Sequence, residues 1–519
     1  MRAFTEPLHE LSGFEEMTKE AQKTGLITIS GCIDAQKSHM IYGIGNGRKN
    51  KVIVTFHEQK AKELYDDYRF FEPNTVYYPA KDILFYQSDI RGNLLTAERI
   101  RALRAIHEQQ EVTVITTFDA LMNTMAPPKT LWDSIRRIEP GDTVVLDELV
   151  ARLVQMGYEK EYQVDTVGQF ALRGGILDVY PLTEDNPVRI EMWGDEVDTI
   201  RSFDVESQKS IENLEELVIY PACELVLDDE EKQAGIARFL KEAKTFASKL
   251  KKEMKTEEAH RALSTAQELA EEWGELSVTA GMDAYLSYFS EARVGLLDYF
   301  DPADTYLFFD ELSRCTERGK QTEVEFAESM KQRLEKGYIL PGQMKELFGF
   351  KEVMGKIERY SCIAVSALDV KTNGLKSNGQ YGIHVKSVNA YNNSFELLIK
   401  DLQHYKKNGY RIILLSGSRT RAERLASDIM NEGLNCFYTD DYDHELLPGQ
   451  IMVCYGKVHK GYEYPILQFA VITETDIFGA ERKKRKRHRT YEGEKIQSFT
   501  ALNVGDYVVH ENHGLGVYK

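Results

Sequence analysis

The sequence lacks the features that mark membrane, secreted and metal-binding proteins. No run approaches the roughly 18 apolar residues that a membrane-spanning helix needs, and the start has no apolar core of a secretion signal. Only six cysteines occur in 519 residues, and none has the C-x-x-C spacing of a metal site. No His/Glu cluster has metal-ligand spacing, and no serine or cysteine nucleophile motif is present. We therefore expect a soluble, cytoplasmic chain with no membrane partner, no bound metal and no catalysis of its own.

Negative charge outweighs positive charge outside one short segment. The net charge is −18, yet residues 482–489 hold seven cations, which leaves −25 on the rest of the chain. Duplex binding draws its affinity from neutralised phosphates, so this acidic body excludes a long DNA track over most of the sequence. The basic segment is either a solvated linker, the interpretation we favour, or an element that contacts DNA phosphates.

The chain is too long for one hydrophobic core, and its patterns indicate several domains. Strands expected near 26–30, 51–56 and 112–117, with helical patterns at 58–70 and 96–108, are typical of a doubly wound α/β domain. Short alternating strands then indicate an inserted, mostly β domain of α+β type. The expected segments are the first α/β part (1–145), the insertion (146–224), the second part of the first domain (225–380), a small α/β domain (381–479), a basic linker (480–499) and the start of a β domain (500–519).

Residues 30–38 match a phosphate-binding loop at every position but one. The pattern G-x-x-x-x-G-K-[ST] has Gly31, Lys37 and Ser38 in place, but Gln36 stands where the second glycine is required. That glycine lets backbone N–H groups curl around phosphate oxygens, and a glutamine side chain should block this cradle. Residues 26–29 indicate a buried strand before the loop, and residues 38–42 indicate the helix after it. The segment indicates a degenerate nucleotide site, although taken alone it fits an ordinary strand, turn and helix equally well.

A second segment has the pattern of the strand that ends in Mg²⁺-binding carboxylates in a P-loop ATPase. Residues 305–311 are an apolar run that ends in Asp310 and Glu311. A buried strand followed by an acidic turn is a common alternative. With the degenerate loop upstream, the pattern favours a degenerate P-loop, RecA-like domain in which these carboxylates are the remains of the nucleotide site.

Taken together, these residues resemble the N-terminal half of the bacterial transcription-repair coupling factors (Mfd). The segments that carry the resemblance are 114–121, 168–181, 461–479 and 505–516. It implies that the front of the chain is similar to the damage-recognition protein UvrB without its nucleotide site, and that 146–224 is the domain that binds UvrA. It also implies that the chain recruits excision repair to stalled RNA polymerase as a binding and regulatory scaffold.

The resemblance implies two sets of partner-binding residues. For UvrA, Arg173 matches the arginine of the R-G-G/A-[IVL]-[IVL]-D motif, with Phe170, Ile176 and the weaker candidate Lys160 beside it. An arginine suits an interface because its planar fork can hold a carboxylate bidentately. Alternatively, Arg173 is a surface cation that positions the following Gly-Gly turn.

For the β subunit of RNA polymerase, the implied residues are Val508, His510, His513 and Gly514, in the first strands of a truncated β barrel. The resemblance implies no cofactor for this chain. ATP, Mg²⁺ and most DNA contacts are expected of motor domains beyond residue 519.

Two other functions stay open. The chain could be a working UvrB-like ATPase or helicase, in which Lys37 and Ser38 bind phosphate and Asp310 and Glu311 handle Mg²⁺ and water. It could also be a transcription regulator that binds RNA polymerase without a link to repair.

Overall fold

The computed structural model describes residues 1–81, 89–275, 282–369, 374–479, 507–510 and 514–517. The chain divides into two compact units, residues 1–478 and 479–519. The basic segment 482–489 lies outside the described residues, so the choice between linker and DNA contact is not tested. Among the described helices, none is long and apolar enough to cross a membrane.

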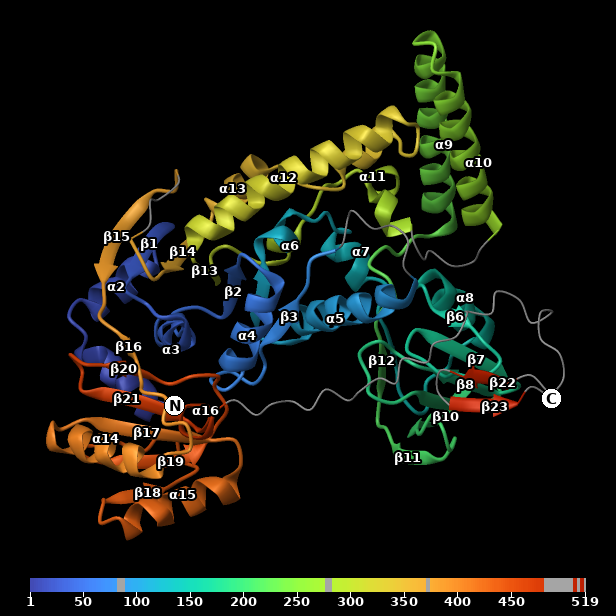
Figure 1. Ribbon diagram of the computed structural model, residues 1–519. Coiled ribbons are helices and arrows are strands. Elements are labelled where there is room, and N and C mark those ends of the chain that lie inside the picture. The colour runs from blue at the N-terminus through green and yellow to red at the C-terminus, as the bar shows by residue number, and fades with distance from the viewer. Residues whose placement is uncertain (82–88, 276–281, 370–373, 480–506, 511–513, 518–519) are drawn as a thin grey trace. The chain divides into compact units, whose positions relative to one another are not determined.

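A seven-stranded parallel sheet is the centre of the first unit (Figure 1). Its order is β15-β1-β14-β13-β2-β4-β3, so strands from residues 25–117 and strands from residues 305–382 belong to one sheet. The strands are β1 (Gly25–Ser30), β2 (Asn50–Thr55), β3 (Val76–Tyr78), β4 (Thr113–Thr117), β13 (Thr305–Asp310), β14 (Ser361–Val365) and β15 (Ser377–Gly382). The central strands are apolar on both sides because helices cover both faces of a parallel sheet.

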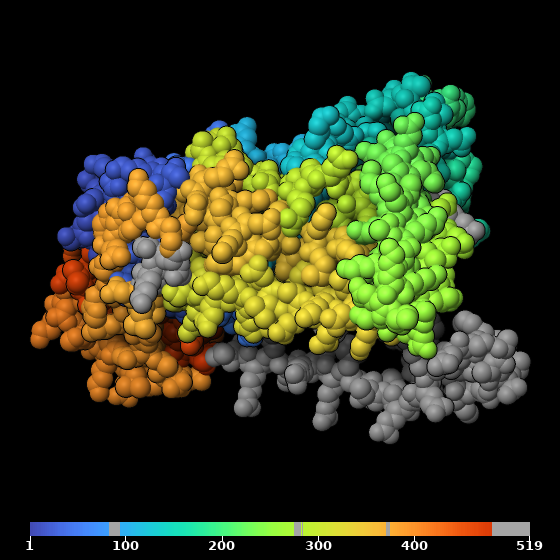
Figure 2. Space-filling model, turned by 90° about the horizontal axis from the view of Figure 1, so that it is seen from above, coloured from blue at the N-terminus to red at the C-terminus, as the bar shows by residue number. Residues whose placement is uncertain are grey.

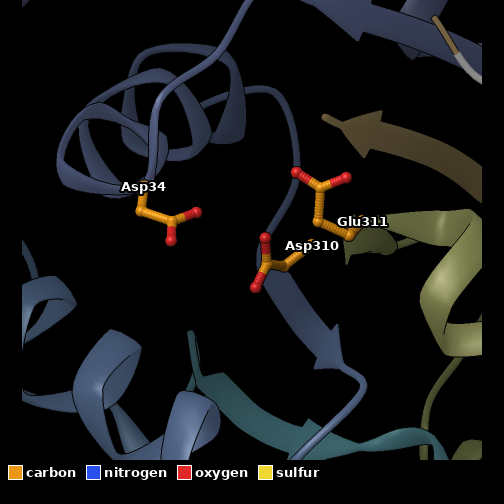
Figure 3. Close-up of side chains that lie close together, drawn as sticks. All are labelled: Asp34, Asp310 and Glu311. Atoms are coloured by element: carbon orange, nitrogen blue, oxygen red, sulfur yellow. The ribbon is translucent and has the colours of Figure 1, made fainter. Parts of the chain in front are cut away.

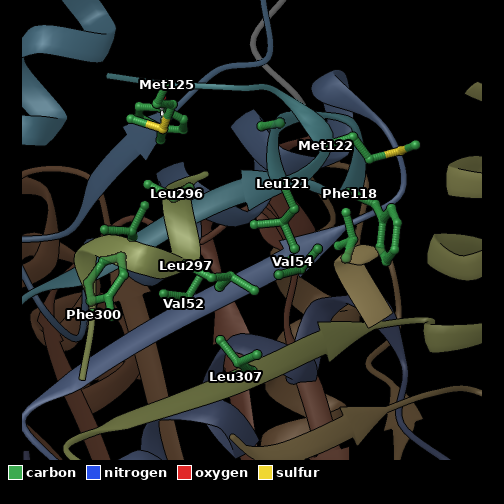
Figure 4. Packing of buried hydrophobic residues seen from close by; sticks show 14 of the residues in the cluster. Val52, Val54, Phe118, Leu121, Met122, Met125, Leu296, Leu297, Phe300 and Leu307 are labelled. Carbon is green, nitrogen blue, oxygen red and sulfur yellow. Dashed lines mark hydrogen bonds between the residues drawn. The ribbon is translucent and has the colours of Figure 1, made fainter. Parts of the chain in front are cut away.

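One face of this sheet packs under helices that follow the strands. They are α5 (Asp89–Glu108), α6 (Phe118–Met122), α7 (Pro128–Trp132), α12 (Leu312–Glu335), α13 (Phe350–Ile357) and the 3₁₀ turn η3 (Leu296–Tyr299). Figure 4 shows this core, in which Val52 and Val54 of β2 and Leu307 of β13 pack against Phe118 and Leu121 of α6.

The opposite face holds the candidate nucleotide loop. Its covering helices are α1 (Arg2–Thr5), η1 (Glu6–Glu10), α2 (Phe14–Ala21), α3 (Asp34–Gly45) and α4 (Glu58–Tyr68). Side chains of the small α/β region join the same hydrophobic cluster, among them Leu415, Met452 and Phe469. The seven-stranded sheet and the sheet of the small α/β region therefore share a core on this side.

The small α/β region has a six-stranded mixed sheet of order β16-β20-β21-β17-β19-β18. Its elements are β16 (Lys386–Ser387), α14 (Phe395–Lys407), β17 (Arg411–Ser416), α15 (Arg419–Asn431), β18 (Cys436–Tyr438), β19 (Ile451–Tyr455), β20 (Tyr462–Tyr464), β21 (Phe469–Thr473) and α16 (Glu474–Phe478). Alternate residues of β17 and β19 face the shared core and a second cluster under α14 and α15.

Another six-stranded sheet, of order β11-β10-β9-β8-β7-β6, lies between residues 159 and 213. Its strands are β6 (Glu159–Lys160), β7 (Gln169–Arg173), β8 (Ile176–Val179), β9 (Val188–Trp193), β10 (Glu196–Phe203) and β11 (Ser210–Asn213). Helix α8 (Leu146–Gln155) packs on one side, and the short pair β5 (Arg136–Ile138) and β12 (Leu217–Ile219) closes this region.

A helical hairpin follows, made of α9 (Asp229–Lys252) and α10 (Thr256–Glu275). Both views place it at the end of the unit away from the small α/β region (Figure 2). The short elements η2 (Met282–Tyr285), α11 (Leu286–Phe289) and η4 (Pro341–Lys345) pack against its base.

The second unit contains an antiparallel pair, β22 (Tyr507–His510) and β23 (Gly514–Val517). The structure thus shows a mixed α/β chain built on a parallel sheet with several further sheets. A truncated barrel and the boundaries of the expected domains remain predictions.

Candidate functional site

The degenerate loop leads from β1 directly into α3, and its backbone N–H groups are already paired. Gly31 N–H donates to the carbonyl of Ala367 at 3.2 Å, and Cys32 N–H to that of Ser366 at 3.1 Å. Gly31 has φ = 82°, and a Cβ there would lie 2.0 Å from the Ile383 carbonyl oxygen. Residues 366, 367 and 383 of the same chain therefore occupy the space beside the loop, and two of them accept hydrogen bonds from N–H groups that a phosphate cradle needs.

Helix α3 begins at Asp34, two residues before Gln36, so Gln36, Lys37 and Ser38 lie within the helix. The sequence had suggested that the helix follows the loop at residue 38. All three side chains are buried. The longer helix leaves only a short connection between β1 and α3.

Lys37 is surrounded by carboxylates. Its Nζ donates to Asp310 at 2.6 Å, Glu311 at 2.7 Å and Asp34 at 2.9 Å. The oxygens of these three carboxylates lie within 4.8 Å of one another (Figure 3). Asp310 also accepts from the Thr55 hydroxyl at 3.0 Å. The carboxylate set could by its chemistry hold a divalent cation, but the Lys37 ammonium already lies within bonding distance of all three groups.

The charges in this cluster stabilise one another. Burial alone would lower the pKa of Lys37, but Asp310, Glu311 and Asp34 raise it above its usual value. Burial alone would raise the pKa of the Asp34 carboxyl, whereas Lys37 and Lys60 lower it below its usual range. At neutral pH the lysine is a fixed internal cation, and its charge is directed to the protein's own carboxylates.

Gln36 makes a contact with the small α/β region. Its Nε2 donates to the Tyr464 hydroxyl at 2.6 Å, and the two residues are 428 positions apart. His39, one turn later, lies 3.0 Å from the same hydroxyl through Nδ1 and 2.7 Å from the Phe4 carbonyl through Nε2. Burial lowers the pKa of His39 to about 4, so this ring is neutral at physiological pH. The residue that departs from the phosphate-loop pattern is thus part of a buried polar contact.

Arg173 lies at the end of β7, at a tight turn into β8. We call Arg173, Gly174, Gly175 and Ile176 the β7–β8 turn. The Arg173 side chain is 38% exposed, and its guanidinium donates to Asp178 at 2.5 Å. Asp178 is buried and also accepts from Arg189 at 2.7 Å and 2.9 Å. Arg173 is therefore partly free to contact another molecule, while Asp178 holds one end of its guanidinium through Nη2.

The other residues proposed for the same surface differ in exposure. Ile176 is half-buried and pairs with Arg173 across the turn, and Lys160 is exposed at the edge strand β6. Phe170 is fully buried in the core beneath α8. From that position Phe170 supports the sheet, and a direct contact with a partner would require the core to open.

Val508, His510 and Gly514 lie in β22 and β23, where His510 pairs with Gly514. His513 lies outside the described residues. The structure therefore gives the backbone pairing at this end of the chain and no side-chain surface for a polymerase contact.

Comparison with known proteins identifies the chain's relatives. The family model of the UvrB interaction domain matches residues 137–225. The chain is 30% identical over 513 residues, 98% of its length, to the transcription-repair-coupling factor of Bacillus subtilis (strain 168), of which it covers 42%. It is 31% identical over 488 residues to that of Staphylococcus haemolyticus, of which it covers 40%. Along nearly its whole length, the chain is homologous to transcription-repair-coupling factors. It spans about two fifths of the length of these curated relatives and corresponds to their N-terminal part.

Two features of the described residues are not found by sequence reasoning. His39 and Tyr464 meet Gln36, but no spacing pattern connects residues this far apart. The second is Trp193, the last residue of β9, which lies beside the β7–β8 turn and is 82% exposed. An alternating strand that ends in an aromatic residue before Gly194 could have drawn attention to it.

Proposed function

We propose that this chain is a binding scaffold that recruits the excision-repair protein UvrA to stalled RNA polymerase. Residues 137–225, which match the UvrB interaction domain, carry the proposal, and Arg173 supplies their partly exposed cation at a tight turn. The parent protein is proposed to be an ATP-driven DNA translocase that displaces the polymerase. In this proposal, motor activity and most DNA contacts belong to segments other than this one.

The degenerate nucleotide site supports a scaffold in preference to an ATPase. The loop donors are paired with residues 366 and 367, and Lys37 is neutralised by three carboxylates. Binding of a nucleotide would have to break both sets of contacts, and each broken buried charge pair is costly. We therefore propose that the RecA-like domain here holds neither ATP nor Mg²⁺ and serves as a structural platform.

We propose further that residues 500–519 begin the domain that contacts the β subunit of RNA polymerase. Val508, His510, His513 and Gly514 are the candidate residues. The antiparallel pairing of β22 with β23 is compatible with the first hairpin of a barrel. The rival, a polymerase-binding regulator without a repair role, predicts capture of polymerase and no binding of UvrA.

The proposal is tested by calorimetry of purified UvrA with this chain and with Arg173→Ala. Loss of an interface arginine should weaken binding by about 1–3 kcal/mol. Arg173→Lys should recover part of the affinity, because it keeps the charge but not the planar fork.

The matched control is Arg137→Ala. This arginine lies in the same matched region, is 60% exposed and pairs with Glu216. It should bind UvrA as the unaltered chain does. If the unaltered chain fails to bind UvrA, the recruitment role is wrong, and RNA polymerase becomes the partner to test.

A further inference from the structure

The outer face of α9 differs in charge from the rest of this acidic chain. One face of the helix packs in the core of the helical hairpin, through residues such as Phe239, Phe246 and Leu250. Residues three or four positions apart share a face of a helix, so the exposed side chains opposite this core form a row. We call this row, in the C-terminal half of α9, the lysine stripe; it consists of Lys241, Lys244, Thr245, Ser248, Lys251 and Lys252.

The lysines of the stripe are not neutralised by the chain itself. Among the described residues, none of these four lysines forms an ion pair. The neighbouring glutamates are engaged elsewhere. Glu242 accepts from the Tyr288 hydroxyl and from the Gly342 N–H at 2.9 Å, on the inner side of the helix. Glu253 pairs with Lys255 at 3.5 Å. The lysine stripe therefore keeps its positive charge, although the net charge of the chain is −18.

Folding alone does not account for the stripe. Cations near the C-terminus of a helix interact favourably with its dipole, but this effect is confined to about the last turn. It covers Lys251 and Lys252, whereas Lys241 and Lys244 lie two turns or more before the end of α9. Like charges three or four positions apart repel each other, and exposed helix faces commonly interleave both signs. The stripe therefore costs the folded chain stability, which indicates a contact with an anionic partner.

The stripe is accessible along its whole length. Figure 1 shows the hairpin of α9 and α10 projecting from the rest of the first unit, and the stripe lies in the half of α9 nearer the tip. The rise of an α-helix places Lys241 and Lys252 about 16 Å apart along the axis. Thr245 and Ser248 between them are short, and their hydroxyls donate to carbonyls one turn earlier at 2.9 Å and 2.8 Å. The longer lysine side chains are thus the outermost groups of this face.

The composition of the stripe favours duplex DNA over a protein or a single strand. Protein interfaces use aromatic and apolar anchors and are poor in lysine, and single-stranded nucleic acids stack their bases on aromatic side chains. The stripe has no apolar or aromatic residue, and the exposed Met254 follows the helix at the hairpin tip. Each strand of a duplex carries one charge per about 3.4 Å of axis, and lysine and arginine are its main contacts.

We propose that the lysine stripe binds phosphates of duplex DNA, in a short contact that does not depend on base sequence. Lysines that face a row of phosphates release condensed counterions, so the contact weakens as salt concentration rises. A contact of this length is compatible with an acidic body, which excludes only a long DNA track. The inference goes beyond the recruitment of UvrA and does not depend on it.

The test measures binding of a fluorescent duplex of mixed sequence by anisotropy over a range of salt concentrations. In the stripe variant, all four lysines of the stripe are replaced by glutamine. Each phosphate contact contributes about 0.9 to the slope of log K against log salt, so the slope should become shallower by about 3–4. Binding at about 50 mM salt should be at least about tenfold weaker. Replacement of the same lysines by arginine keeps the charge and should keep both affinity and slope.

The matched control removes the same charge from other helices. Its lysines are exposed and lie on α12, α13 and α14: Lys331, Lys351, Lys400 and Lys407. Their replacement by glutamine should leave the slope unchanged. Thermal unfolding checks that each variant is folded, and the stripe variant should bind UvrA as the unaltered chain does.

The other strongly basic part of the chain, residues 482–489, could also contact DNA. The comparison is therefore repeated with the cations of 482–489 replaced by glutamine. The loss of affinity caused by the stripe variant should be of the same size in this background. Disappearance of the effect there would overturn the proposal.

Protection from acetylation, read by mass spectrometry, separates a direct contact from an indirect effect. Duplex DNA should slow the acetylation of the stripe lysines and leave that of Lys331 and Lys351 unchanged. Polyglutamate, as a model of an acidic protein surface, should not protect the stripe. The proposal is wrong if the stripe variant behaves like the control variant, if DNA leaves the stripe unprotected, or if polyglutamate protects it as well as DNA does.

Discussion

Lys37 has the same position in the sequence pattern as a phosphate-binding lysine and a different set of partners. In this structure its ammonium is bonded to Asp34, Asp310 and Glu311, and its side chain is 1% exposed. Such a cation holds three negative charges together in and beside the core. Lys37 therefore stabilises the folded chain, because removing the lysine or one of its carboxylates would leave uncompensated charge.

Replacing Lys37 by methionine should destabilise the first unit by about 3–5 kcal/mol, because buried carboxylates lose their counter-ion. Urea unfolding near pH 7 measures this. The loss should shrink on acidification, since a protonated carboxyl group needs no counter-ion. Lys62→Met is the control. Lys62 is 53% exposed, pairs with Glu58 one turn away and lies over the Tyr77 ring at 5.6 Å, so its replacement should cost less than about 0.5 kcal/mol. Equal losses in the two variants would contradict the assigned role.

At the scale of elements, the sequence predicted strands and helices where the apolar pattern is long and regular. The strands expected near 26–30, 51–56 and 112–117 agree with β1, β2 and β4 within a residue or so. The three-residue β3 was missed because its pattern is too short to show a period. Helix α5 begins at Asp89, several residues before the expected start at 96. For the candidate site, Gln36 could be singled out from the sequence, but its partner Tyr464 comes from another sheet.

The contact between α3 and β20 should make stability depend on pH. The folded pKa of His39 is about 4, below the ordinary 6.5, so the unfolded chain binds a proton first as the pH falls. The contribution of neutral His39 to the free energy of unfolding is complete above about pH 6.5 and decreases toward pH 4. The decrease is about 2 kcal/mol between pH 7.5 and 5.

Urea unfolding at these pH values, in the unaltered chain and in His39→Phe, measures the difference. The variant lacks the titrating ring and should show a flatter dependence on pH. Identical slopes would show that His39 does not titrate in this way.

For the whole molecule, the account predicts a chain that does not respond to nucleotide. ATP with Mg²⁺ at millimolar concentration should leave the melting temperature unchanged, whereas a functional site filled at 100 times Kd would add about 2.7 kcal/mol. Gln36→Gly should also show no shift, because the donors of Gly31 and Cys32 remain paired and Lys37 remains bonded to carboxylates. A nucleotide-dependent rise in either protein would favour the ATPase alternative.

The central claim is that residues 137–225 bind UvrA while the degenerate nucleotide loop takes no part. Hydrogen–deuterium exchange of the whole chain, with UvrA and separately with ATP and Mg²⁺, tests both halves at once. UvrA should slow exchange in peptides covering residues 159–193, around the β7–β8 turn, and nucleotide should change nothing in peptides covering 30–38. Protection of the loop by nucleotide, or binding of UvrA without protection at the turn, would contradict it.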